Sequence, residues 1–174
     1  IDACLVGSEM CIRDRDNSGN RVKVDDQRLN PIWEICGELN IPVLIHSGEP
    51  SPFFDHIDKH NERFLHARQK PQSFRNSDEY PSFDEVMQEQ YNMFKNNPNT
   101  TFINAHLGWY GNDLDKMSAQ LDDLPNVYTE IGAVIAELGR QPIRARRFFV
   151  EHQDRILFGK DTYKKSEFDV SVSY

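Results

Sequence analysis

Cysteine is scarce in this sequence, and its three residues follow no metal-binding or disulfide pattern. Cys4, Cys11 and Cys36 provide neither a closely spaced ligand pair nor the even number that a disulfide framework needs. A zinc ribbon and a small disulfide-stabilised domain are therefore excluded. A reducing compartment, by default the cytoplasm, is expected, on the assumption that no signal peptide lies upstream.

Long apolar runs and excess positive charge are also missing. No run approaches the roughly 20 apolar residues that cross a bilayer, so no membrane partner is expected. The 20 basic residues are outnumbered by 28 acidic ones, giving a formal charge of -8, which argues against a nucleic-acid partner. The 174 residues suffice for one domain but fall short of the roughly 250 typical of a complete eight-stranded α/β barrel.

The first fifteen residues differ in character from the remainder. The segment Cys4–Asp14 reads CLVGSEMCIRD and resembles the conceptual translation of a sequencing-library transposase adapter, with Arg15 at the junction. Residues 1–15 are therefore predicted to be adapter-derived and not native. Residues 16–174 are assigned to one native domain, although Val172–Tyr174 resemble the start of the reverse-complement adapter.

Helical and strand patterns alternate through the native part. Apolar residues at steps of three and four predict helices, and short β-branched apolar runs predict buried strands. Predicted helices cover residues 25–40, 82–94, 112–123 and 141–150, and predicted strands cover 41–46, 100–105, 126–131 and 155–159. The aromatic and charged segment 53–81 is interpreted as an excursion on the rim. This alternation predicts a parallel α/β sheet but does not choose between a barrel and an open doubly wound sheet.

An ionisable residue stands at the end of each predicted strand: His46, His106, Glu130 and Asp161. The carboxyl edge of a parallel sheet carries the active site in α/β folds, and imidazoles with a carboxylate suit Zn²⁺ or Mn²⁺. Each residue also has a plain structural explanation. A histidine can cap a strand, Asp161 can cap a helix, and Glu130 can pair with an arginine.

Four segments carry a family resemblance. They are PVLIH at 42–46, NTTFINAHLG at 99–108, NVYTE at 126–130 and DRILFGKD at 154–161. They resemble consecutive strand motifs of the amidohydrolase-related metal-dependent hydrolases, in the branch that includes aminocarboxymuconate-semialdehyde decarboxylase. The resemblance covers about residues 26–163 and implies a partial TIM (β/α)₈ barrel, roughly its last four βα units.

The resemblance also implies roles for individual residues. His46 and Asp161 would be metal ligands, and His106 would transfer protons beside the metal. Asp161 would also orient or deprotonate the water that the metal activates. Glu130 and Trp109 are weaker candidates for substrate contact. Zn²⁺ is the expected ion and Mn²⁺ the alternative. The first-strand His-x-His motif of such families does not occur in this sequence, and we attribute it to an upstream segment.

Three functions are consistent with these residues. The leading hypothesis is a metal-dependent hydrolase that cleaves a carbonyl-centred bond of a small molecule through a metal-activated water. The second is a non-oxidative decarboxylase of an aromatic or unsaturated acid. The third is a non-catalytic α/β binding domain. The full-length protein could form a homo-oligomer, whereas the 174-residue chain alone is expected to be inactive and to aggregate through its unpaired strand edges.

Overall fold

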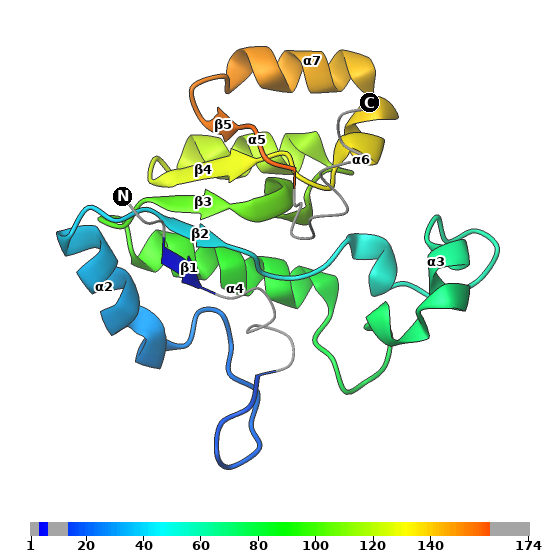
Figure 1. Cartoon of the computed structure of the whole chain (residues 1–174), viewed down its shortest axis with the longest axis horizontal. Coiled ribbons are helices and arrows are strands. Elements are labelled where there is room, and N and C mark those ends of the chain that lie inside the picture. Colours follow the sequence, from blue (N-terminus) through cyan, green and yellow to red (C-terminus); the bar gives the residue numbers. More distant parts are fainter. Residues whose placement is uncertain (1–3, 7–13, 161–174) are drawn as a thin grey trace.

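The computed structural model describes residues 4–6 and 14–160, which form one parallel sheet with helices packed against it (Figure 1). The strands are β1 (Cys4–Val6), β2 (Val43–Ile45), β3 (Phe102–Asn104), β4 (Val127–Glu130) and β5 (Ile156–Leu157). The helices are α2 (Asn30–Glu38), α3 (Phe64–Gln69), α4 (Phe83–Asn96), α5 (Leu114–Asp123), α6 (Ile135–Gly139) and α7 (Pro142–Glu151).

The strands lie in the sheet in the same order as in the chain, β1-β2-β3-β4-β5, and every pairing is parallel. A doubly wound sheet would reverse its strand order at a switch point, and no reversal occurs among the described strands. Sequential parallel neighbours are the arrangement of an arc of a (β/α)₈ barrel. The topology therefore decides the alternative that the sequence left open.

Local sequence signals explain where the main helices begin and end. The Ser82 hydroxyl accepts from the Glu85 backbone N–H, and the Glu85 carboxylate accepts from the Ser82 backbone N–H, so α4 begins with the predicted capping box. Helix α2 ends in a Schellman motif. Asn40 has φ 53°, its N–H donates to the Gly37 carbonyl, and the Ile41 N–H donates to the Cys36 carbonyl. Both signals were readable in the sequence.

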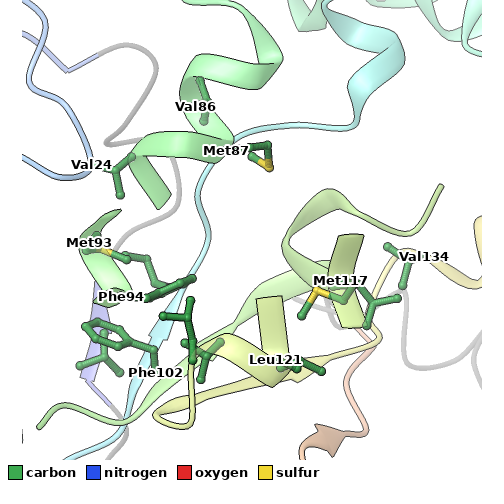
Figure 2. Close-up of a cluster of buried hydrophobic side chains, with 14 of the residues drawn as sticks. Val24, Val86, Met87, Met93, Phe94, Phe102, Met117, Leu121 and Val134 are labelled. Atoms are coloured by element: carbon green, nitrogen blue, oxygen red, sulfur yellow. The ribbon is translucent and has the colours of Figure 1, made fainter. Parts of the chain in front are cut away.

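The hydrophobic core lies between one face of the sheet and its helices. Val43, Phe102 and Val127 pair in register across β2, β3 and β4, and all three are fully buried. The Phe102 ring packs against Phe94 of α4 at 5.0 Å and against Trp33 of α2 at 5.9 Å between ring centroids. Figure 2 shows Phe94 and Phe102 together in this core, which continues to Met117 and Leu121 of α5.

The other face of the sheet is only half-buried. Leu44, Ile103 and Tyr128 form its central row, one residue out of phase with the core row. Because side chains alternate along a strand, His46 and Glu130 continue the face of Leu44 and Tyr128 to the carboxyl edge. This pattern places the candidate site residues at the strand ends, away from the helix-covered core.

The excursion between β2 and α4 lies toward the ends to which the strands point and contains α3 (Figure 1). It is joined to α6 and its C-cap residue by ion pairs. Arg63 Nη2 lies 2.7 Å from Glu137 Oε1, and Arg140 Nη1 lies 2.9 Å from Glu62 Oε2. Glu137 is only 5% exposed, so the Arg63 guanidinium compensates a largely buried carboxylate. These contacts fix the excursion on the rim.

Four of the five strands, β2 to β5, are those predicted from the sequence, and each of their ends is one or two residues shorter than predicted. Strand β1 lies inside the segment assigned to the adapter, where no strand was predicted. The pairing of three backbone residues does not bear on the origin of that segment, so its assignment stays a prediction. Among the described residues, no helix is long and apolar enough to cross a bilayer.

Candidate active site

The carboxyl ends of β2, β3 and β4 bring two histidines and one glutamate together. The His46 and His106 rings lie 4.9 Å apart between centroids and nearly perpendicular, at 80°. His106 is 5% exposed, whereas His46 is half-buried. Glu130 Oε1 lies 3.2 Å from His106 Nδ1. Three of the four predicted strand-end residues therefore share one small region.

His106 stands in an unusual backbone conformation. Residues His106, Leu107, Gly108 and Trp109 all have positive φ, between 53° and 62°, and begin two positions after the last residue of β3. We call these four residues the left-handed turn. For residues with a side chain this conformation costs roughly 1–2 kcal/mol each, so surrounding contacts must hold it.

Hydrogen bonds to β4 and to the segment directly after it fix the His106 main chain and ring. Its backbone N–H donates to Glu130 Oε1 at 2.6 Å. Its Nδ1 lies 2.8 Å from the Gly132 carbonyl oxygen. Because a carbonyl oxygen only accepts, Nδ1 carries the proton of this bond, and the lone pair of the neutral ring is on Nε2. The ring is thus prepared for proton transfer or ligation through Nε2.

Trp109 closes the turn against both imidazoles. Its ring centroid lies 4.6 Å from that of His106 and 5.5 Å from that of His46. Its Nε1 is buried without a hydrogen-bond partner in the described part of the chain. The structure places Trp109, a predicted substrate contact, directly beside both histidines.

A family model described as amidohydrolase matches residues 15–163 of the chain. The chain belongs to the amidohydrolase family. This membership, together with the sequential parallel sheet, confirms the predicted partial TIM barrel. No curated protein matches the amidohydrolase chain.

Solved structures share the fold of this amidohydrolase at low identity. 2,6-Dihydroxybenzoate decarboxylase from Rhizobium aligns at a TM-score of 0.51 and 14% identity, covering 90% of this chain and 50% of that one. A dihydroxybenzoic acid decarboxylase from Polaromonas sp., with bound manganese and the inhibitor 2-nitroresorcinol, aligns at 0.51 and 16%, covering 90% and 49%. The amidohydrolase chain thus spans about half the length of these structures.

The residues predicted as metal ligands are only partly among the described residues. Asp161, predicted as a ligand and catalytic residue, lies outside them. Between residues 14 and 160, no group of three or more His, Cys, Asp or Glu side chains could hold an ion. His46 fits a ligand role by its imidazole, its half-buried position at the strand end and its closeness to His106. Further ligands would come from Asp161 and from beyond the described residues.

Both carboxylate oxygens of Glu130 already accept hydrogen bonds from the backbone. Oε1 accepts from His106, and Oε2 accepts from the Gly132 backbone N–H at 2.5 Å. The sequence left open that Glu130 pairs with an arginine. Among the residues that the structure describes, no arginine or lysine pairs with it. The structure therefore places Glu130 against His106 and the backbone after β4.

A buried polar network beneath the site was not predicted. The Gln90 amide donates to Ser47 Oγ at 2.7 Å and accepts from Asn104 Nδ2 at 2.8 Å, and Thr129 Oγ1 donates to the Asn104 carbonyl at 2.8 Å. All four residues are at most 2% exposed. The network joins the loop after β2 to α4, β3 and β4, and no spacing in the sequence points to it.

The tyrosine that follows the left-handed turn is also affected by its surroundings. Burial raises the pKa of Tyr110 above its usual value of 10.0, and the nearby Asp84 and Asp113 carboxylates raise this pKa further. The Tyr110 phenol therefore stays protonated at neutral pH. It can act at the rim as a neutral hydrogen-bonding group.

Proposed function

We propose that the full-length protein is a metal-dependent hydrolase that cleaves a carbonyl-centred bond of a small molecule. Family membership supports the enzyme class. The observation that carries the proposal is the state of His106, whose Nδ1 is held by the Gly132 carbonyl while Nε2 retains its lone pair beside His46. A buried imidazole fixed in one tautomer at the carboxyl edge of a parallel sheet is suited to general acid–base work.

The residues divide the work as follows, and Asp161 would also orient the water that the ion activates. His46 and Asp161 would hold the ion, Zn²⁺ first and Mn²⁺ as the alternative. When bound, the ion would polarise the substrate carbonyl and make a water nucleophilic at neutral pH. His106 Nε2 would accept a proton during attack and donate it to the leaving group, a contribution of roughly 10²- to 10⁴-fold. Trp109 would form an apolar wall beside the two imidazoles.

A decarboxylase of an aromatic acid is the second candidate, and one comparison favours it. The dihydroxybenzoate decarboxylase structures share the fold at a TM-score of 0.51. An aromatic substrate would find Trp109 next to the histidines. In this reaction His106 would first take up a proton on Nε2, from solvent or from the substrate acid or hydroxyl group, and would then deliver it to the carbon that loses CO₂. The same two histidines thus serve either chemistry.

The test uses the full-length protein with its bound metal. His46→Ala should lower the metal content and abolish turnover, because an ion ligand is removed. His106→Asn should keep the metal content and still lower kcat by about 10²-fold or more, because proton transfer is removed. Metal analysis and kinetics on the same preparations separate the two roles.

Product analysis separates the two reactions. Esters, lactones and amides are assayed for hydrolysis, and hydroxybenzoates are assayed for CO₂ release. Release of CO₂ without hydrolysis would overturn the leading proposal in favour of the decarboxylase. A His106→Asn variant with unchanged turnover would contradict both. A protein without bound metal or turnover would support the non-catalytic domain.

A further inference from the structure

Glu130 is a largely buried carboxylate that contacts His106 and the backbone after β4. Its side chain is 12% exposed, and within residues 14–160 no cationic side chain of lysine or arginine compensates it. Its two oxygens instead accept from the backbone N–H groups of His106 and Gly132. Burying a carboxylate is costly, so these bonds are an essential part of its stabilisation.

The first effect of this carboxylate is on the backbone. The left-handed turn, His106 to Trp109, begins at the residue whose N–H donates to Glu130. Four successive residues with positive φ are unfavourable without such external contacts. Glu130 Oε1 therefore fixes the start of the turn from the neighbouring strand β4.

The second effect is on the His106 ring. Two oxygen atoms face Nδ1: the Gly132 carbonyl oxygen at 2.8 Å and Glu130 Oε1 at 3.2 Å. A carbonyl oxygen and an ionised carboxylate can only accept hydrogen bonds, so both favour a proton on Nδ1. Glu130 also anchors Gly132, since Oε2 accepts from the Gly132 N–H. The Glu130 carboxylate thus contacts Nδ1 of His106 and also positions the Gly132 carbonyl, which accepts the Nδ1–H hydrogen bond.

The segment after β5 also packs closely against this carboxylate, at a glycine. A Cβ at Gly159 would overlap with Glu130 Oε2 and lie 2.8 Å from its Cδ. Only glycine permits the close approach of this backbone to the carboxylate. Glu130 is therefore enclosed by the turn after β3, the backbone after β4 and the segment after β5.

We propose that Glu130 is the positioning residue of the site. Its carboxylate holds the left-handed turn and keeps the proton of His106 on Nδ1, so that the lone pair on Nε2 is available for proton transfer. The proposal rests on the proposed function for its kinetic consequence. Its structural consequence, the tautomer of His106, is measurable without turnover. Glu130 itself contacts no substrate in this role.

The test is Glu130→Gln in the full-length protein. A glutamine keeps the shape but offers one oxygen for two N–H donors, so one bond is lost. Nitrogen-15 NMR of the histidine rings at alkaline pH, where imidazoles are neutral, reports the tautomer, and subtraction of the His106→Asn spectrum assigns the signals. We expect His106 to change from the Nδ1–H form to a mixture of both tautomers. We also expect kcat to fall about 10- to 100-fold with an unchanged KM.

Leu121→Ala is the matched control. It removes a buried α5 side chain, 2% exposed, and destabilises the fold without removing a hydrogen bond of His106 or Glu130. It should leave both the tautomer and kcat unchanged. If Leu121→Ala changes them as much as Glu130→Gln does, the effect is general destabilisation and the proposal is wrong.

A second variant keeps the proposal testable if Glu130→Gln does not fold. Gly159→Ala retains the carboxylate but forces it to move, so the same change in the His106 signals is expected. A pure Nδ1–H spectrum in either folded variant would overturn the positioning role. Turnover that survives His106→Asn would instead refute the proposed function, while the NMR result would still decide the role of Glu130.

Discussion

Replacing Gly108 by alanine tests how the left-handed turn is packed. Gly108 has φ 55°, and a Cβ there would overlap with Asn104 Nδ2 and lie 2.9 Å from Gln90 Oε1. The backbone conformation alone costs an alanine roughly 1–2 kcal/mol. The methyl group would also break the Asn104–Gln90 hydrogen bond, whose partners are fully buried, at about 1–3 kcal/mol. The expected loss of unfolding free energy is therefore about 2–5 kcal/mol.

Two other glycines provide matched controls. Gly19 has φ 83°, but a Cβ added there would have no atom within 4 Å, so Gly19→Ala should lose only the backbone contribution of about 1–2 kcal/mol. Gly139 has an ordinary φ and open space around it, so Gly139→Ala should be neutral or slightly stabilising. The difference between Gly108→Ala and Gly19→Ala isolates the packing contribution.

Equilibrium urea unfolding followed by far-ultraviolet circular dichroism measures these differences, because this signal does not depend on Trp109 inside the turn. The three variants and the wild type, all as full-length protein, are compared at one temperature and pH. Equal destabilisation by Gly108→Ala and Gly19→Ala would refute the close packing of Gly108 on the buried amides. It would also show that the buried amides of Asn104 and Gln90 can move aside without a loss of stability.

Two further predictions concern the rim and α4. Arg63→Ala leaves the buried Glu137 without its nearest partner and should cost about 1–3 kcal/mol in urea unfolding, whereas Lys116→Ala, at an exposed pair, should cost almost nothing. Ser82→Ala should cost about 1 kcal/mol at neutral pH. Hydrogen bonds from Ser82 lower the Glu85 pKa below 4.5, so this difference should shrink as the pH falls through that lowered pKa. A difference that is constant with pH would count against the capping box.

The helices and strands could be predicted because their signals are local. Ser82 and Glu85 specify the start of α4, and Asn40 specifies the end of α2, since each makes its bonds within a few residues. The run at 41–46 and the run at 100–105 predicted buried strands whose cores are β2 and β3. The ends of these predicted strands differ from the observed ones, because strand ends depend on pairing rather than on composition. Strand β1 and helix α6 were not predicted.

The conformation of the site could not be predicted in the same way. Leu107 and Trp109 have no local preference for positive φ, and only Gly108 hints at it. Their conformation depends on Glu130, which is 24 residues from His106 and becomes a neighbour only when β3 and β4 pair. The sequence identified Glu130 as a candidate through its strand-end position but not through its contact with His106. Asp161 stays a prediction.

The strands are unevenly separated along the sequence, and this has a consequence for folding. Val43 pairs with Phe102 across 59 residues of chain, whereas Phe102 pairs with Val127 across 25. Loop-closure entropy makes the longer connection costlier by about 0.8 kcal/mol, before any ordering of the excursion. We therefore expect β3, β4 and their helices to form the folding nucleus and β2 to dock later. His106 and Glu130 would then meet early, and His46 would complete the pair of imidazoles only in the last step.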